Sequence, residues 1–155
     1  MRLEWGESTG RELIINILIG WRILRFVYHS DIAKMYRQIH VHPDDRKYQR
    51  ILRRSNPSQS LSVYELYTVT YGIGPSAYQS IRALHQLAAD ESSKFPQASK
   101  LVFKNMYVDD VLFGADDIDD AISLAQELSN LLIVGGFPLR KWSDNPDLLK
   151  HLPVE

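Results

Sequence analysis

The stretch KNMYVDDVLFGADD, residues 104–117, places two adjacent aspartates, Asp109 and Asp110, between two short apolar segments. Two like charges about 4 Å apart repel by roughly 4 kcal/mol at an effective dielectric constant near 20. The apolar flanks predict strands over 101–107 and 111–115, joined at the aspartates by a tight hairpin. The most stable two-residue hairpin turns usually have Asn-Gly or Asp-Gly at that position. The acidic pair therefore needs a counter-charge, and Mg²⁺, which prefers carboxylate oxygens, is one that fits.

Aspartate doublets also occur at 44–45, 116–117 and 119–120, so a doublet alone is a poor signal. Those three have turn or helix-cap explanations. Asp31 differs, because it ends another apolar segment, a strand predicted over 25–31. If that strand lies beside the hairpin, three carboxylates converge at one sheet edge. Two cations about 3.5–4 Å apart could then clamp the attacking and leaving oxygens of a phosphoryl displacement.

The rest of the chain predicts further helices and strands, which we list in chain order. We expect a buried helix over 11–24, a helical turn at 33–39, a turn at 42–45, and strands at 46–54 and 64–70 around the loop 55–60. A helix follows Pro75, and its apolar stripe is Ala77, Ile81, Leu84 and Ala88. A last helix, capped by Asp116 or Asp117 and closed by Gly135-Gly136, has the stripe Ile118, Ile122, Ala125, Leu128 and Leu132, and a strand follows at 137–142. This order favours an α+β fold in one domain over 1–155, with an antiparallel sheet and helices packed on one face.

Composition excludes several classes of protein. The 155 residues are 45% hydrophobic and 24% charged, which is ordinary for one globular domain. There is no cysteine, so disulfides and thiolate metal sites are excluded. No secretory pattern or membrane-spanning run is present near the N-terminus. Net charge is −1, yet the segment 46–54 holds five of the 18 basic residues: Arg46, Lys47, Arg50, Arg53 and Arg54.

Four ordered segments carry a family resemblance. Asp31, with Tyr36 five residues on, resembles motif A of reverse transcriptases, and YVDD at 107–110 resembles motif C. TYGIGPSAYQ resembles motif B, and GGFPLRKW the region of motif D. The sequence of these segments is most similar to that of the Bel/Pao group of LTR retrotransposon polyproteins, over about residues 11–145. A lone YxDD is a weak signal, whereas the ordered set is specific.

The resemblance implies a polymerase palm with part of the fingers and no thumb, an RNA-directed DNA polymerase. It implies that Asp31, Asp109 and Asp110 are catalytic and hold two Mg²⁺ or Mn²⁺ ions, with the backbone carbonyl of Ile32 as a further ligand. The remaining implied residues fall into two groups. Those near the dNTP are Tyr36 as a steric gate, Tyr71, Gly72 and Lys141, the last acting on the leaving pyrophosphate; those near template and primer are Arg46, Lys47, Arg50, Arg53, Arg54 and Tyr107.

The implied partners are an RNA or DNA template-primer, a dNTP, and polyprotein domains that this sequence does not contain, namely a thumb, a ribonuclease H and an integrase. The implied compartments are a cytoplasmic retroelement particle and the nucleus. Two rival interpretations stay open. One is an inactive or domesticated remnant that binds nucleic acid or a protein; the other, an RNA polymerase or nucleotide cyclase palm, is disfavoured by Tyr36 and Tyr107.

Overall fold

The computed structural model describes residues 10–144, which divide into two compact units. The sheet unit comprises residues up to Ala33 and from Leu84 on, and the hairpin unit comprises Lys34–Ala83. The elements run in the order α1 (Gly10–Arg22), β1 (Phe26–Ile32), the 3₁₀ helices η1 (Met35–Gln38) and η2 (Pro43–Tyr48), β2 (Arg50–Arg53), β3 (Ser62–Glu65), α2 (Ser76–Asp90), α3 (Pro96–Lys104), β4 (Met106–Tyr107), β5 (Asp110–Ala115), α4 (Ile118–Val134) and β6 (Leu139–Asp144). The predictions for 1–9 and 145–155 lie outside the described residues.

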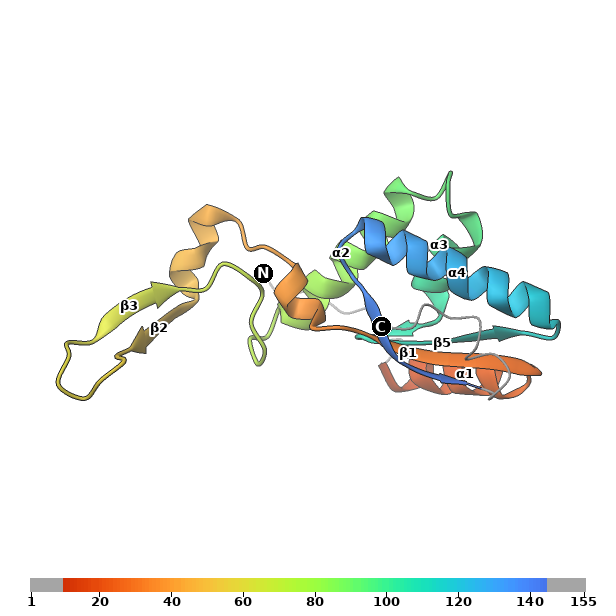
Figure 1. Cartoon of the computed structure of the whole chain (residues 1–155), viewed down its shortest axis with the longest axis horizontal. Helices are drawn as coiled ribbons and strands as arrows, with labels where there is room; N and C mark the ends of the chain where they lie inside the picture. Colours follow the sequence, from red (N-terminus) through yellow and green to blue (C-terminus); the bar gives the residue numbers. More distant parts are fainter. Residues whose placement is uncertain (1–9, 145–155) are drawn as a thin grey trace. The chain divides into compact units, whose positions relative to one another are not determined.

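The sheet unit is built on four antiparallel strands in the order β4-β5-β1-β6 (Figure 1). Strand β1 pairs with β5 over its whole length, from Phe26 opposite Ala115 to Asp31 opposite Asp110. The two middle strands therefore come from segments about eighty residues apart in the chain. The predicted α+β class with an antiparallel sheet is confirmed at this level.

Helices cover this sheet on both sides. Consecutive strand residues point to opposite faces, and β5 buries Phe113 on one face and Leu112 on the other. Helix α4 packs against β1, β5 and β6, whereas α1 packs against β4 and β5. Figure 1 shows these two helices on opposite sides of the strands. The expectation of helices on one face alone therefore does not hold.

Helix α4 follows the predicted pattern closely. The Asp117 side chain caps its first turn by accepting hydrogen bonds from the backbone N–H groups of Asp119 and Asp120. The buried stripe is broader than predicted and includes Ala121 and Leu131 as well as Leu128. The helix ends at Gly135, and Gly136 takes a φ of +76°, where glycine carries no steric penalty.

The predicted strand at 101–107 is wrong, because its first four residues end helix α3 and only Met106–Tyr107 are strand. Pro96 stands in the first turn of α3, where its missing N–H costs nothing. The Glu127 carboxylate of α4 accepts hydrogen bonds from the backbone N–H groups of Gln97 and Ala98, at 2.9 and 3.1 Å. The cap that starts α3 therefore comes from a distant helix.

The hairpin unit consists of two short 3₁₀ helices, the β2–β3 hairpin and the start of α2. The hairpin is as predicted, but its strands are shorter than 46–54 and 64–70. Residues 46–48 belong to η2, which begins at His42-Pro43; there the His42 ring accepts a hydrogen bond from the backbone N–H of Asp44. All residues of β2 and β3 are exposed. The predicted helix after Pro75 is confirmed as α2.

Helix α1 is confirmed as a helix but not as a buried one. Ile17 is 4% exposed, whereas Ile15 and Ile19 are more than half exposed. The Trp21 indole N–H donates to the backbone carbonyl of Tyr28 at 3.0 Å, which ties the end of α1 to β1. No helix within residues 10–144 combines the length and the apolarity that a bilayer crossing requires.

Candidate metal centre and nucleic-acid surface

The sheet unit brings the three predicted aspartates to one end of the sheet. Asp31 and Asp110 face each other across the β1–β5 ladder, so both side chains project from the same face. Asp109 lies in the turn between β4 and β5, and its backbone carbonyl accepts a hydrogen bond from the N–H of Ile32 at 2.8 Å. Two carboxylates on neighbouring strands and a third in the adjoining turn form an acidic cluster of Asp31, Asp109 and Asp110.

The turn that carries the acidic cluster has an unfavourable backbone. Tyr107 pairs with Asp110, so Val108 and Asp109 alone make the turn. Val108 has a φ of +58°. A β-branched residue rarely adopts this region, and such strain costs on the order of 1–3 kcal/mol. Strain of this kind persists where the surrounding structure imposes the conformation, and here it occurs in the turn that carries Asp109.

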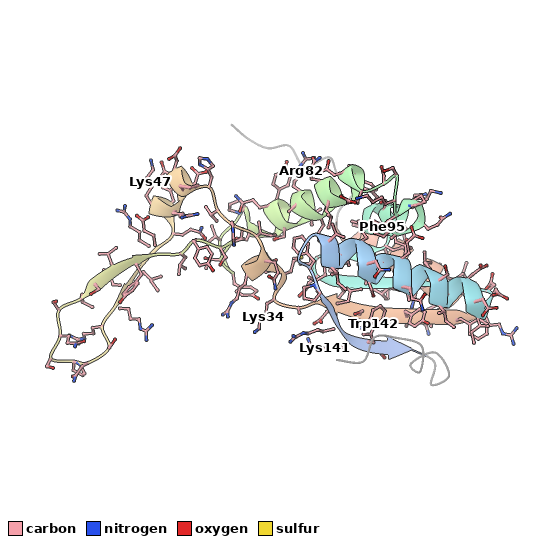
Figure 2. All side chains as sticks on the ribbon, turned by 45° about the horizontal axis from the view of Figure 1, so that its top comes forward. Lys34, Lys47, Arg82, Phe95, Lys141 and Trp142 are labelled. Atoms are coloured by element: carbon pink, nitrogen blue, oxygen red, sulfur yellow. The ribbon has the colours of Figure 1, made fainter. Side chains whose placement is uncertain are left out.

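Two cationic or titratable side chains contact the acidic cluster. The Lys141 ammonium donates a hydrogen bond to Oδ2 of Asp31. His29 Nε2 lies 3.1 Å from Oδ1 of Asp110. The hydrogen bond to Asp31, and then the charge of Asp31, raise the pKa of Lys141, and the charges of Asp109 and Asp110 act in the same direction. Figure 2 labels Lys141 on β6, next to Trp142.

The two oxygens of the Asp31 carboxylate differ in their contacts. Oδ1 is buried and has no hydrogen-bond partner among the described residues. A buried carboxylate oxygen without a donor is costly, and a divalent cation would satisfy it. As the side chains stand, no three acidic or histidine residues between 10 and 144 are arranged to hold one metal ion. The carboxylates of the acidic cluster are the kind of oxygen ligand that Mg²⁺ prefers, but their side chains are not arranged as a metal site in the described residues.

Sequence reasoning missed His29 as a member of this site. Residues two apart on a strand share a face, so the position of His29 two residues before Asp31 was an available signal. Sequence reasoning also assigned Lys141 to pyrophosphate rather than to an aspartate. That contact depends on how β6 pairs with β1, which no local pattern specifies.

The basic segment 46–54 lies in the hairpin unit, and its members differ in how they are held. Arg46 donates to the backbone carbonyl of Val41 at 3.1 Å. Arg50 pairs with Glu65 across the hairpin, with 2.7 Å between Nη2 and Oε1. The other three are exposed on η2, β2 and the residue after it: Lys47, Arg53 and Arg54. These exposed charges suit contacts with phosphates. Tyr107, predicted with them, lies on β4 in the sheet unit.

The residues predicted near the dNTP are split between the units. Tyr36 and Tyr71 lie in the hairpin unit, with ring centroids 4.8 Å apart in an edge-to-face arrangement. Gly72 has a φ of +78°, which favours glycine, and a Cβ built there would meet nothing within 4 Å. Lys141, the fourth of these residues, lies in the sheet unit beside Asp31.

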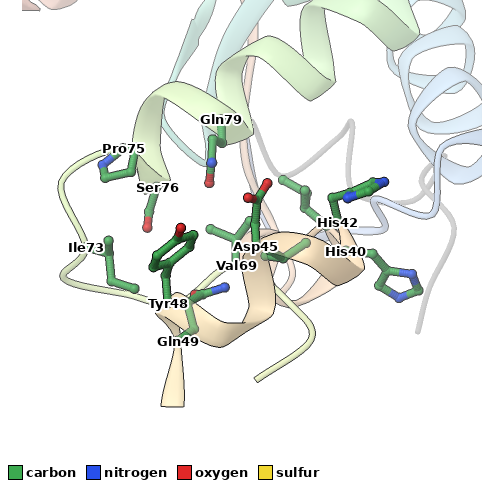
Figure 3. Close-up of a pocket in the computed structure, with 12 residues that line it drawn as sticks. His40, His42, Asp45, Tyr48, Gln49, Val69, Ile73, Pro75, Ser76 and Gln79 are labelled. Carbon is green, nitrogen blue, oxygen red and sulfur yellow. The ribbon is translucent and has the colours of Figure 1, made fainter. Parts of the chain in front are cut away.

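The hairpin unit also contains a cavity of about 470 Å³, between η2 and the start of α2 (Figure 3). Figure 3 shows the polar ends of Asp45, Tyr48 and Gln79 directed toward one another. The lining residues are Ile39, His40, Val41, His42, Asp45, Tyr48, Gln49, Val69, Ile73, Pro75, Ser76 and Gln79. None of the predicted site residues lines it.

Comparison with known proteins adds no family to these observations. No protein-family model matches the chain, and no curated protein matches it significantly. The arrangement of the acidic cluster and the motifs of the sequence are therefore what any functional assignment depends on.

Proposed function

We propose that this chain is the palm, with part of the fingers, of a retrotransposon reverse transcriptase of the Bel/Pao type. The observation that carries the proposal is the register of β1 and β5, which sets Asp31 opposite Asp110 beside the turn residue Asp109. These are the three aspartates that motifs A and C of the resemblance single out. The reaction is nucleotidyl transfer, in which a primer 3′-hydroxyl attacks the α-phosphate of a dNTP and pyrophosphate leaves.

The acidic cluster would hold two Mg²⁺ or Mn²⁺ ions through its three carboxylates and the Ile32 carbonyl. When bound, the ions supply charge neutralisation and activate the primer hydroxyl. The protein's own contribution is positioning. The β1–β5 ladder fixes Asp31 against Asp110, and the strained turn at Val108 fixes Asp109.

The other proposed roles follow the resemblance. The Tyr36 ring would exclude a ribose 2′-hydroxyl, and its edge contact with Tyr71 would hold it in orientation. Gly72 would let the backbone approach the nucleotide closely. The exposed basic side chains of 46–54 would contact template phosphates, which attract cations without regard to sequence. Tyr107 would lie beside the primer terminus.

A second candidate is a non-catalytic domain that binds nucleic acid. The observation in its favour is that Asp31 and Asp110 already have protein partners, Lys141 and His29. In this case the carboxylates would be structural, and the basic segment would bind nucleic acid without chemistry.

Single-nucleotide addition tests the proposal against this rival. A labelled DNA primer on an RNA template is incubated with excess protein, Mn²⁺ or Mg²⁺, and one dNTP at a time. We expect slow addition of the templated nucleotide alone, lost in Asp31→Asn and Asp110→Asn and retained in Asp119→Asn, an exposed acid of α4. Addition that both cluster variants retain would contradict the proposal, as would no addition at any metal concentration by protein that still binds the template-primer.

A further inference from the structure

Strand β6 departs from regular geometry at Lys141. The backbone φ of this residue is +55°, in the left-handed region that lysine rarely adopts. The register of β6 against β1 shifts between His29 and Asp31, as at a β-bulge. Bulges redirect side chains, and the Lys141 ammonium here meets Asp31. Strained backbone of this kind is common at residues whose side chains have a functional role.

The two partners of this ion pair are unequally buried. The Asp31 side chain is 16% exposed, whereas that of Lys141 is 79% exposed. The anion is therefore held by the sheet and the cation approaches it from solvent. A long exposed side chain can rotate away without disturbing the core, so the lysine can leave Asp31 while the aspartate stays in position.

A nearby cation stabilises the acidic cluster. Three carboxylates in one place repel each other, and Asp31 is too buried for water alone to screen it. The Lys141 ammonium supplies a positive charge at Oδ2 of Asp31, and the buried Oδ1 has no hydrogen-bond partner among the described residues. A divalent cation bound to Asp31 would lie within a few ångströms of the Lys141 ammonium, and repulsion between the two cations would weaken the contact at Oδ2.

We propose that Lys141 is the internal counter-ion of the acidic cluster in the metal-free protein and is displaced from Asp31 when a divalent cation binds. The inference rests on the proposed two-metal site, which it deepens by naming what the metal must replace.

The expected effects are modest, because one partner of the pair is mostly exposed. Exposed ion pairs change an equilibrium by about twofold to fivefold. Replacing Lys141 by methionine should therefore lower the melting temperature in EDTA and tighten Mn²⁺ binding by about two- to fivefold. Lys141→Arg keeps the charge and should behave like the wild type in both measurements.

The test measures melting temperature in EDTA and across an Mn²⁺ titration for the wild type and for Lys141→Met, Lys141→Arg and Asp31→Asn. Lys100→Met, at an exposed lysine of α3, is the matched control for loss of a charge and should change neither quantity. A Lys141→Met/Asp31→Asn double variant completes the cycle in EDTA. The loss caused by Lys141→Met should be smaller when Asp31 is already asparagine.

The outcomes separate the inference from the proposed function. A metal-dependent shift that requires Asp31, but is unchanged or weakened in Lys141→Met, overturns the inference and leaves the proposed metal site standing. A shift that Asp31→Asn does not reduce overturns the proposed metal site and, with it, the displacement. In that case the melting temperatures in EDTA of the wild type, the two single variants and the double variant still test whether Lys141 neutralises Asp31. If the effects of Lys141→Met and Asp31→Asn are additive, Lys141 is not the counter-ion of Asp31 and the inference fails completely.

Discussion

Val108 shows how a single residue reports on the acidic cluster. Its left-handed φ at the hairpin turn is unfavourable for a β-branched residue. A sequence selected for stability alone would place glycine or asparagine there. The position of the strain, between Tyr107 and Asp109, suggests that the turn type serves the orientation of the two aspartates.

The first prediction is that Val108→Gly stabilises the protein. Glycine adopts positive φ freely, so the substitution removes about 1–3 kcal/mol of strain and adds about 0.5–1 kcal/mol of backbone entropy cost. We expect the free energy of unfolding, measured with urea, to rise by about 1 kcal/mol. The control is Val27→Gly, at a half-buried valine of β1 outside the positive-φ region, which should lower it. Equal losses in both variants would show that Val108 is not strained.

The second prediction concerns sugar selection by Tyr36. In an active polymerase that contains this chain, Tyr36→Val should increase ribonucleotide use relative to deoxynucleotide use by on the order of 10–100-fold. The reason is that removing a steric clash changes the difference between two substrates. The measurement is kcat/KM for a matched rNTP and dNTP, with Tyr78→Val, a tyrosine of α2, as control. An equal loss for both sugars would make Tyr36 a packing residue that supports Tyr71.

At the scale of elements, local signals predicted what local interactions decide. The Asp117 cap and the Gly135-Gly136 end of α4 depend on neighbours in sequence, and both are confirmed. A tight turn before β5 is also present, but it consists of Val108 and Asp109 rather than of the two aspartates. Helix α3 does not depend on local signals alone, because its first backbone N–H groups donate to the Glu127 carboxylate, thirty residues away. Without that cap, LVFKNMY reads as a strand. The pairing of Lys141 with Asp31 was unpredictable for the same reason.

The third prediction tests the β1–β5 ladder through its glycine. A Cβ on Gly114 would collide with the Phe26 carbonyl oxygen and lie 2.9 Å from Val27 Cα, and both are backbone atoms that cannot rotate away. Gly114→Ala should therefore destabilise the protein by about 1–3 kcal/mol or more. Gly20→Ala is the matched control: nothing lies within 4 Å of its Cβ, and helix α1 should gain about 0.5–1 kcal/mol. Similar urea midpoints for the two variants would contradict the register.

For the whole molecule, charge limits how strongly a duplex can bind. The net charge is −1, and basic residues concentrate in the segment 46–54, where Arg50 is already paired with Glu65. Affinity for nucleic acid comes largely from phosphate contacts, each of which releases counterions. Within the segment 46–54, Arg50 is held by Glu65 and Arg46 donates to a backbone carbonyl, so we expect this segment to hold a template-primer only weakly.

The last prediction is that this chain alone extends a primer poorly even if its acidic cluster is competent. We expect duplex affinity in the non-specific range, about 10⁻⁴–10⁻⁶ M at physiological salt. The slope of log K against log salt should flatten by about 2 in an Arg53→Ala/Arg54→Ala double variant, because each lost phosphate contact removes about 1. Lys100→Ala, outside the basic segment, should leave that slope unchanged. At such affinity the template-primer dissociates before many additions occur, so extension on RNA with Mg²⁺ and all four dNTPs should stop after one or a few nucleotides. Long products that Asp109→Asn abolishes would contradict this, and would mean that contacts other than the basic segment hold the duplex.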